Sequence, residues 1–559
     1  MLSRLGRRLR ARREAAAASE VADLVVSHLR DVERPLVAVH HRSLPGLCEV
    51  LRRTLRTAEI VELPRNATDR HLLMTRRGPF DAVVDAIDAQ HRPRRFQDLF
   101  WHLAPGRSYV VPGGASELGS PPGDLGALLH DASSAPDQPL RGGKRRKSRQ
   151  YVRLALRNHV RHQIMGDHLV LTHDLPDVLV KVREDDYNAF LSSSAAPPHR
   201  LLELIPAEDP PPAPDFREGP DIRRRPLERP IGRASLSLRD YRDVVVAPLQ
   251  LVVDGRLLLP DTYRHNQAPE SGHKALADLG PRFAVTRKPF PDELPRLDGT
   301  FLHLDNEARG HFGHVLTEML SRMWTWERAL EIDPDIQVIM GATRRRPAIA
   351  EWEFEFYAAC GIPRERIVLL EQDAPVRVER LVSGTPMWSQ PHYVHPRIRE
   401  TWRTVGDTLA SQASPRDDWP RRIFVSRRIT KRACLNADQL EAEFRDAGFD
   451  VVFPEDYALG DQVALFRNAE VIAGYAGSGM FQTLFVPQPR HVIQIASEAY
   501  GPRNEYLIAA TLGHRLDSVI CRAEPFDGRK QMHAPFRYDP EREGPFLREI
   551  LDSLPPFAR

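Results

Sequence analysis

Short apolar runs alternate with amphipathic segments along most of the chain, and the alternation is densest between residues 422 and 497. Each apolar run there is followed by a segment whose apolar positions recur every three to four residues, the spacing of a helix packed on a sheet. Such alternation predicts a parallel sheet, because each crossover helix returns the chain to the same sheet edge. The predicted fold class is therefore α/β.

The region before this sheet has a similar pattern. Residues 243–262 predict a run of strands with a turn at Asp254-Gly255, and an amphipathic helix is expected over about 312–330. Its apolar stripe, expected in the core, is Phe312, Val315, Leu316, Met319, Met323 and Leu330. Together these patterns predict two lobes, residues 236–416 and residues 417–559. A helix at about 541–553 is expected to pack back on one of them.

The first 115 residues predict another small α/β unit, with strands at 35–41, 57–63 and 80–86. The order FDAVVDA … FQDLFWHLAPGRSYVV resembles the back half of class I methyltransferases. Those enzymes need a glycine-rich turn after the first strand, so that the backbone can approach the cofactor. Here the turn is HHRSLPG, with a single late glycine, Gly46. An acidic residue, Glu62, is present at the end of the second strand but is a weak signal alone. We therefore interpret residues 1–115 as a degenerate, non-catalytic Rossmann-like domain.

Residues 116–235 are expected to form a linker. A small hairpin is predicted from HLVLTH (168–173) and DVLVKV (177–182), and the proline-rich segment 207–220 predicts a semi-rigid spacer that does not pack. The basic run 144–149 has no interleaved aromatic residues, so a solvated linker is favoured over a nucleic-acid site.

Composition narrows the class of protein. The 559 residues are 42% hydrophobic and 28% charged, with a formal net charge of only +3, so neither a polyanion nor nucleic acid is expected as the main partner. Arginine and alanine are abundant, which suggests a bacterial source. The four cysteines are widely spaced, without a CxxC pair or a Cys/His cluster of metal-binding spacing, and a reduced intracellular setting is the simpler interpretation.

The N-terminus is basic and lacks the apolar core of a signal peptide, and no stretch approaches the ~20 apolar residues that span a bilayer. We expect a cytoplasmic protein. Arginines at positions 7, 8, 10, 12 and 13 make the first helix a candidate for peripheral contact with an anionic membrane surface, while a solvated helix is the default.

Three stretches of the C-terminal half resemble glycosyltransferase family 61. HFGHVLTEMLSRMW (311–324) is similar to its His-x-x-x-Asp/Glu helix, and RRIFVSRRITKRACLN (421–436) to its Arg-x-x-x-Ser-Arg strand. FPEDYALGDQVALFRNAEVIAGYAGSGMFQTLFVP (453–487) is similar to its Pro-Glu and glycine-turn segment. The resemblance extends over about 236–520 and implies a GT-B enzyme, in which two Rossmann-like lobes bind a nucleotide sugar.

His314 and Glu318 are the candidate catalytic residues. They are four apart, so they share one face of a helix. A sugar hydroxyl needs a general base within hydrogen-bond reach, and an imidazole or a carboxylate can serve. A structural His/Glu pair is the alternative, and the sequence leaves open which of the two residues is the base. His311 stands where the family often has asparagine.

Candidate ligands of the donor diphosphate lie at two places in the last lobe. The first is the end of a buried strand, where arginine's planar fork suits a diphosphate. The second is a glycine turn that leads into a helix, where backbone N–H groups attract anions. The predicted diphosphate ligands are Ser426, Arg427, Arg428, Arg432, Gly477, Ser478 and Gly479. Glu455 is a candidate for nucleoside binding.

The sequence departs from the family where Ala476 and Gln482 replace a common histidine and asparagine, which puts the identity of the donor in doubt. The acidic groups at 184–190 and 305–310 lack metal-like spacing, so we expect no required metal or other cofactor. The predicted function is inverting sugar transfer from a nucleoside-diphosphate sugar to a saccharide, in capsular or cell-surface polysaccharide synthesis. The alternatives are a non-catalytic carbohydrate-binding scaffold, or an S-adenosylmethionine-dependent methyltransferase acting through residues 1–115.

Overall fold

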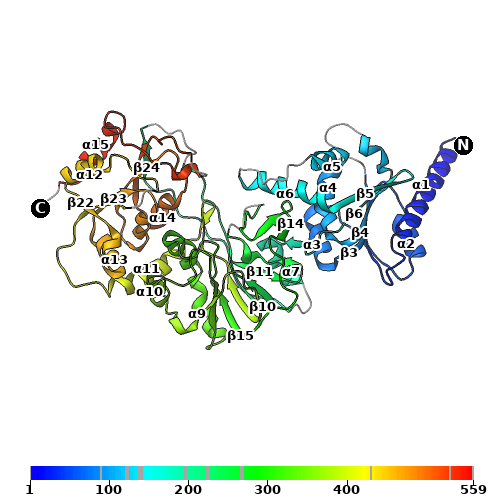
Figure 1. Cartoon of the computed structure of the whole chain (residues 1–559), viewed down its shortest axis with the longest axis horizontal. Helices are drawn as coiled ribbons and strands as arrows, with labels where there is room; N and C mark the ends of the chain where they lie inside the picture. Colours follow the sequence, from blue (N-terminus) through cyan, green and yellow to red (C-terminus); the bar gives the residue numbers. More distant parts are fainter. Residues whose placement is uncertain are drawn as a thin grey trace. The chain divides into compact units, whose positions relative to one another are not determined.

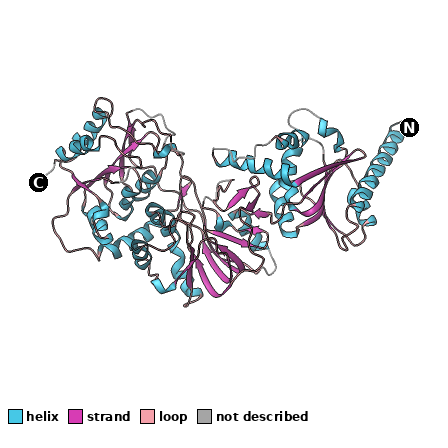
Figure 2. Ribbon diagram, in the orientation of Figure 1, coloured by secondary structure: helices cyan, strands magenta, loops and turns pink. Residues whose placement is uncertain are grey.

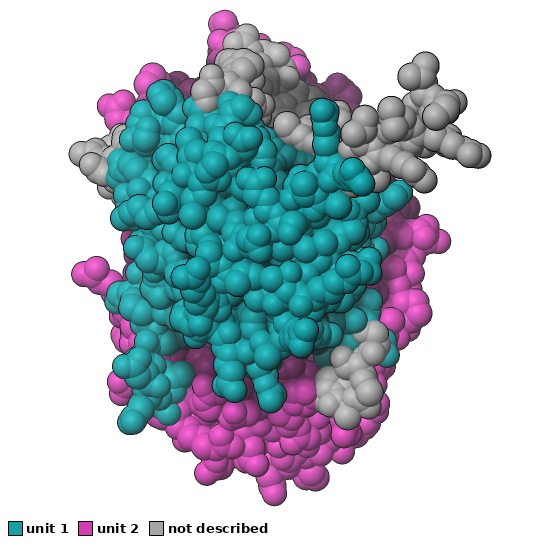
Figure 3. Space-filling model, turned by 90° about the vertical axis from the view of Figure 1, so that its right-hand side faces the viewer, with its two compact units in different colours: residues 1–196, 251–294 teal, residues 197–250, 295–559 magenta. Residues whose placement is uncertain are grey.

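A computed structural model describes residues 2–87, 91–119, 125–134, 143–193, 198–220, 227–264, 270–428, 431–527 and 530–556. The chain divides into two compact units, coloured separately in Figure 3. Unit 1 consists of residues 1–196 and 251–294, and unit 2 of residues 197–250 and 295–559. Both contain sheets flanked by helices (Figure 2), which confirms the α/β class.

The main sheet of unit 1 has the strand order β2-β1-β3-β4-β6-β5. The first four strands are parallel, β6 is antiparallel to β4, and β5 is antiparallel to β6. The bounds are β1 Leu36–His41, β2 Glu59–Glu62, β3 Phe80–Ala86, β4 Leu103–Val111, β5 Val160–Met165 and β6 His168–His173. The sheet therefore continues well beyond residue 115, the boundary expected from the sequence.

Helices cover both faces of this sheet (Figure 1). One face packs on α1 and α2 through a cluster that includes Val21, Val25 and Leu51, and the other packs on α3, α4 and α5. The helices of unit 1 are α1 Leu2–Ser27, α2 Leu47–Thr54, α3 Ala67–Arg77, α4 Arg92–Leu99, α5 Leu125–Ser133, α6 Lys144–His159 and α7 Glu184–Ser193. None of the helices in the described part of the chain is long and apolar enough to cross a membrane.

Two expectations for the linker are wrong. The basic run 144–149 is not a loop but the start of α6, which forms because Val152, Ala155 and Leu156 give the segment a buried face. The segments 168–173 and 177–182 do not pair with each other. The first is β6, which joins the main sheet, and the second contains β7 (Leu179–Lys181), which pairs with β12 and β14.

The remaining strands of unit 1 form the group β13-β14-β7-β12-β11. Their bounds are β11 Leu251–Asp254, β12 Leu257–Leu258, β13 Leu276–Asp278 and β14 Phe283–Thr286. Asp254 pairs with Leu257 across a tight turn in which Gly255 has φ 52°, which confirms the predicted Asp-Gly turn.

The first sheet of unit 2 has the order β8-β10-β18-β15-β16-β17. Its bounds are β8 Arg200–Ile205, β10 Leu236–Ala247, β15 Arg296–His303, β16 Gln337–Gly341, β17 Ile367–Leu370 and β18 Val376–Gly384. Strands β15 to β18 pair in parallel, whereas β10 is antiparallel to both β18 and β8. The sheet is therefore mixed, and the GT-B arrangement stays a prediction.

The second sheet of unit 2 is entirely parallel, with the order β22-β21-β23-β24-β25-β9. Its bounds are β9 Phe216–Gly219, β21 Arg422–Val425, β22 Asp450–Val452, β23 Val471–Tyr475, β24 His491–Ser497 and β25 Arg515–Cys521. Strand β9 comes from the proline-rich segment, so the expectation that this segment does not pack is wrong. It adds an edge strand to the sheet, where prolines beyond the paired residues do no harm.

Helices surround both sheets of unit 2. They are α8 Phe312–His314, α9 Trp326–Ile332, α10 Glu351–Ala359, α11 Ile398–Ala410, α12 Ala437–Asp446, α13 Leu459–Asn468, α14 Asn504–Leu512 and α15 Gly544–Asp552. One apolar cluster joins the two sheets, with members such as Val338 from the first and Ile472 from the second. As expected, α15 packs back on the second sheet, through Leu547 and Ile550.

Candidate functional site

The segment that carries His314 and Glu318 is helical throughout but irregular. It begins as α8, widens into a π-helical turn (Val315–Met319), tightens into a 3-10 helix (Leu320–Thr325) and continues as α9. The predicted apolar stripe lies in or against the core. π-helical turns inside helices occur frequently at functional sites, and Glu318 lies within this one.

His314 and Glu318 form a hydrogen-bonded pair. His314 Nδ1 lies 2.8 Å from Glu318 Oε1. The imidazole is 31% exposed and the carboxylate only 8%. Asn306 Nδ2 donates to the other oxygen, Glu318 Oε2, at 3.0 Å. The carboxylate is thus held from two sides, and the histidine is the more accessible member of the pair.

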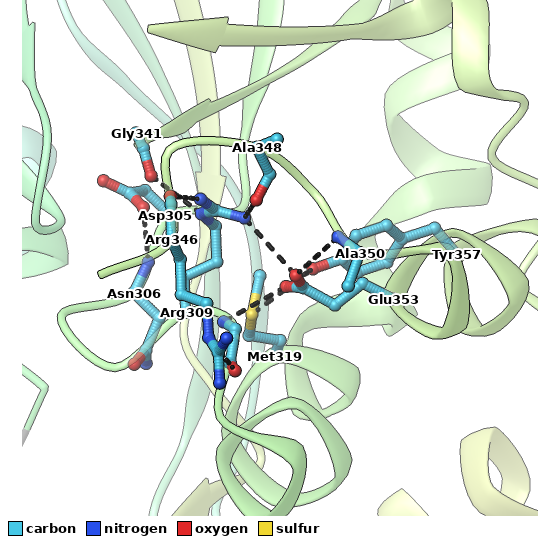
Figure 4. Close-up of polar contacts among 11 residues, drawn as sticks. Asp305, Asn306, Arg309, Met319, Gly341, Arg346, Ala348, Ala350, Glu353 and Tyr357 are labelled. Atoms are coloured by element: carbon cyan, nitrogen blue, oxygen red, sulfur yellow. Dashed lines mark hydrogen bonds and ion pairs between the residues drawn. The ribbon is translucent and has the colours of Figure 1, made fainter. Parts of the chain in front are cut away.

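Asn306 is itself fixed by a buried carboxylate, Asp305 (Figure 4). Asp305 Oδ1 accepts from the Asn306 backbone N–H at 2.8 Å, and Oδ2 accepts from the Gln250 N–H at 2.7 Å. Burial raises the pKa of Asp305, and these backbone donors act in the opposite direction. The result is a continuous polar chain from Asp305 through Asn306 and Glu318 to His314.

A buried ion pair braces the loop that carries Asn306 (Figure 4). Arg309 Nη1 lies 3.4 Å from Glu353 Oε2, and both side chains are fully buried. Arg309 Nε donates to the Gly341 carbonyl at 2.8 Å, and the Tyr357 hydroxyl donates to Glu353 at 3.2 Å. Breaking such a pair on one side costs about 3–5 kcal/mol, so this loop is held rigidly behind His314 and Glu318.

The glycine turn after β23 has a conformation that requires glycine. Gly477 has φ 137° and ψ −169°, a region closed to residues with a Cβ. Ser478 and Gly479 begin a 3-10 helix (Ser478–Phe485). The first N–H groups of a helix have no partner inside it, which makes this end of the turn suitable for an anion.

Arg427 and Arg432 close around this turn. Arg427 Nη1 donates to the Ala476 carbonyl at 3.2 Å, and Nη2 donates to the Arg432 carbonyl. A Cβ placed on Gly477 would lie 2.8 Å from Arg432 Nη2 and 3.8 Å from Arg427 Nη1. Within the described residues, the Nε atoms of both arginines are buried and have no hydrogen-bond partner.

These two half-buried arginines repel each other. Burial, and after it the charge of Arg432, lower the pKa of Arg427 to about 10. The guanidinium groups lie over aromatic rings, Arg427 over Tyr475 at 5.1 Å and Arg432 over Tyr500 at 4.9 Å. Two neighbouring cations with unused donors form a favourable environment for a bound anion.

Sequence reasoning missed Glu505, which lies in the first turn of α14. Its Oε1 accepts from the Gly477 N–H at 2.7 Å and from the Tyr500 hydroxyl at 3.2 Å. Burial raises the pKa of Glu505, while the charge of Arg432 acts against the increase. The Gly477 N–H is therefore already engaged by a carboxylate. The sequence signal that could have indicated Glu505 is an acidic residue in the first turn of a helix, α14, that follows a strand of the parallel sheet, β24.

Three predicted residues have other partners. Ser426 is buried, and its hydroxyl donates to Glu441 at 2.7 Å. Arg428 is exposed, donates to Asp456 at 2.6 Å and lies over the Phe453 ring. Glu455 is also exposed, with Oε1 3.9 Å from Arg428 Nη1. Carboxylates therefore engage both Ser426 and Arg428 at the end of β21.

The helix with His314 and the glycine turn meet within unit 2. A Cβ on Gly313 would lie 2.9 Å from Ser478 Cβ and 2.9 Å from the Phe481 ring. The rings of His311 and His314 have their centroids 4.7 Å apart. Burial lowers the pKa of His311 to about 4, and the charges of His314, Lys431 and Arg432 add to the effect. The histidine pair and the basic turn thus lie within electrostatic reach of each other.

Comparison with known proteins gives one family. Residues 312–493 match the model of the family Glycosyltransferase 61, which confirms the resemblance seen in the sequence and supports glycosyltransferase activity. The matched range includes His314, Glu318, both arginines and the glycine turn. No curated protein matches the chain.

Among solved structures, the chain is similar to the methyltransferase MycE from the mycinamycin biosynthetic pathway. One such structure, in complex with magnesium, SAH and mycinamycin VI, is 20% identical and has a TM-score of 0.21, and a second, with magnesium and SAH, is 19% identical with the same score. The match covers 29% of this chain and 48% of each MycE chain, so this chain spans about half the length of the MycE chains that it matches. These proteins are methyltransferases, like the class that residues 1–115 resemble, but a TM-score this low carries no functional argument.

Proposed function

We propose that unit 2, which contains the segment matching Glycosyltransferase 61, transfers a sugar from a nucleoside-diphosphate sugar to a saccharide hydroxyl with inversion at the anomeric carbon. The observation that carries the proposal is the position of two half-buried arginines around Gly477, beside the helix of His311 and His314. Within the described residues, the buried Nε donors of both arginines are unused. The two arginines suit a diphosphate, and the histidines beside them offer a proton acceptor.

In the proposed reaction, Arg427 and Arg432 bind the diphosphate of the donor. The bond between the anomeric carbon and the diphosphate oxygen breaks, and its electron pair stays on the diphosphate. Preorganised cations that meet this developing charge lower the barrier. The first N–H groups of the helix at Ser478 and Gly479 add hydrogen-bond donors. Arg428 and Ser426 are left out of this role because Asp456 and Glu441 engage them.

His314 is the proposed general base, and Glu318 orients it. Glu318 is more deeply buried, and both of its oxygens are engaged, one by His314 and one by Asn306. If Nδ1 donates to Glu318, the lone pair of the imidazole is on Nε2, which takes the proton from the acceptor hydroxyl. The acceptor oxygen then attacks the anomeric carbon from the face opposite the leaving diphosphate. A single displacement of this kind inverts the configuration.

Arginines and backbone amides take the place of a divalent ion in this scheme, so transfer is proposed to be independent of metal. Glu455 stays a prediction for nucleoside binding. The proposed setting, which rests on the family resemblance and on composition, is capsular or cell-surface polysaccharide synthesis in the bacterial cytoplasm.

Thermal unfolding of the full chain with nucleotides tests donor binding. A ligand that binds only the folded state raises the midpoint in proportion to the logarithm of its concentration over its dissociation constant. We expect UDP or GDP to stabilise the wild type, and Arg427→Ala to abolish the shift. Arg428→Ala is the matched control, an arginine one residue away that keeps the shift. Equal loss in both variants, or no shift with any nucleotide, contradicts the assignment.

A further inference from the structure

Three side chains of different ligand classes converge in unit 1, far along the chain from the residues discussed above. His41 ends β1, Glu62 ends β2, and Cys48 lies in the first turn of α2. One imidazole nitrogen, the thiol sulfur and one carboxylate oxygen all lie within 4.8 Å of one another. Nitrogen, sulfur and oxygen donors in one place are the ligand set of zinc sites.

The fold explains why they meet. Strands β1 and β2 are parallel neighbours, with Val39 opposite Glu62. Side chains two apart on a strand share a face, so His41 lies on the same side of the sheet as Val39. Helix α2 covers that side through Leu47, Cys48 and Leu51, which pack in one cluster with Val39. The cluster therefore lies at the carboxyl ends of parallel strands, the edge where α/β sheets bind ligands.

The distance between the histidine and glutamate donor atoms fits a tetrahedral ion. His41 Nε2 lies 3.3 Å from Glu62 Oε2. A zinc ion with bonds of about 2.0 Å to nitrogen and oxygen holds two such ligands about 3.3 Å apart at the tetrahedral angle. The other carboxylate oxygen, Glu62 Oε1, accepts from Arg52 Nη2 at 2.8 Å. This hydrogen bond orients the carboxylate so that Oε2 faces the histidine. Outer-shell partners orient metal ligands in the same way.

A surface hydrogen bond joins His41 to Glu62, and the buried thiol of Cys48 contacts the same carboxylate. Cys48 is a free thiol that is 4% exposed, and the rest of its packing is with apolar residues. Its sulfur nevertheless lies beside an imidazole and a carboxylate. His41 and Glu62 are 28% and 48% exposed, so an ion can reach the cluster from solvent.

We propose that His41, Cys48 and Glu62 bind a zinc ion in unit 1, as three protein ligands with the fourth position open to water or another small ligand. The sulfur ligand disfavours magnesium and calcium, which prefer oxygen. Three protein ligands with an open position are typical of zinc sites that act on a bound molecule rather than closed structural sites. The site is separate from the proposed transfer reaction in unit 2, which uses no metal.

His41, Cys48 and Glu62 do not have the spacing of a linear metal-binding motif, so no metal site was predicted from the sequence. The proposal also changes the interpretation of Glu62. The sequence alone makes this acidic residue at the end of a strand only a weak signal, and its place beside His41 and Cys48 assigns it to a cation site.

Titration of the untagged, chelator-treated full chain with Co²⁺ tests the site, because cobalt replaces zinc and reports its ligands by absorption. We expect one equivalent to bind, with the intense visible bands of a tetrahedral site and a near-ultraviolet thiolate-to-cobalt band. Zn²⁺ should displace the cobalt. Cys48→Ser removes the thiolate band, whereas Cys434→Ser, which changes a half-buried thiol of unit 2, keeps it.

Because Cys48 is buried, Cys48→Ser could misfold, and a second variant at a more exposed ligand is needed. His41→Ala changes a half-exposed residue at the end of a strand and is expected to weaken cobalt binding at least tenfold without changing the circular dichroism spectrum. A wild type that binds no cobalt, a thiolate band that survives in Cys48→Ser, or unchanged affinity in His41→Ala overturns the proposal. None of these results depends on the transferase activity.

Discussion

A Cβ on Gly313 would lie 2.9 Å from the Cβ of Ser478, so the helix of the histidine pair and the glycine turn touch at a point where only glycine fits. Neither atom belongs to the flexible end of a side chain, so an added methyl group pushes one segment away from the other. The contact fixes the distance between the proposed base and the proposed diphosphate site.

We therefore expect Gly313→Ala to lower the stability of unit 2 by about 1–3 kcal/mol, the usual cost of overpacking, and to reduce transfer through misplacement of His314. Gly501→Ala is the control, because an added Cβ at that position has nothing within 4 Å. Denaturant unfolding and transferase rates of the two variants measure both effects. If Gly313→Ala behaves like Gly501→Ala, the two segments are not in contact.

Substitutions along the polar chain separate catalysis from positioning. We expect His314→Ala to lower kcat by about 10²–10⁴-fold, the usual contribution of a general base. Asn306→Ala releases one oxygen of Glu318 and is expected to lower kcat about tenfold through loss of orientation. Both should keep the KM for the donor and the nucleotide-induced thermal shift. If nucleotide binding is lost together with kcat, the hydrogen-bonded residues from Asp305 to His314 support the fold rather than the reaction.

We expect acid to destabilise unit 1 through two buried histidines, His71 and His102. His71 Nδ1 lies 3.0 Å from His102 Nε2, and burial lowers the pKa of His71 to about 3 and that of His102 well below 6.5. The unfolded chain takes up protons on both below pH 6.5 and the folded chain does not, so stability is full above pH 6.5 and falls as the pH drops towards 3.

The double substitution His71→Gln with His102→Gln removes these two groups and is expected to flatten the loss of stability between pH 6.5 and 4. Each proton withheld by the folded state accounts for about 1.4 kcal/mol per pH unit. Chemical unfolding at several pH values compares this variant with His162→Asn, which changes an exposed histidine. Equal pH slopes in all three proteins would contradict the assignment.

Local patterns predicted much of the second sheet of unit 2. Strands such as β21 and β23 and helices such as α12 and α13 lie inside residues 422–497, where strands and helices are expected to alternate, because strong periodicity and short connections define them. The pairing of distant segments was not accessible in the same way. Strand β9 pairs with β25 almost 300 residues later, and no local signal in a proline-rich segment indicates that partner.

The candidate site shows the same division. Spacing alone placed His314 beside Glu318, and the strand end placed Arg427 near the glycine turn. Asn306 and Glu505 reach the site only through tertiary contacts. The partner of Arg428 could not be predicted either, because the end of a strand indicates where the arginine lies but not which carboxylate it binds.

Turnover of a panel of nucleotide sugars by the full chain tests the central claim most directly, with saccharide acceptors present and water as the default acceptor. The account predicts that one nucleotide sugar is consumed with release of its nucleoside diphosphate. Arg427→Ala and His314→Ala should abolish this turnover, and Arg428→Ala should retain it. Specific nucleotide binding without consumption of any nucleotide sugar would contradict the account and identify a non-catalytic binding protein.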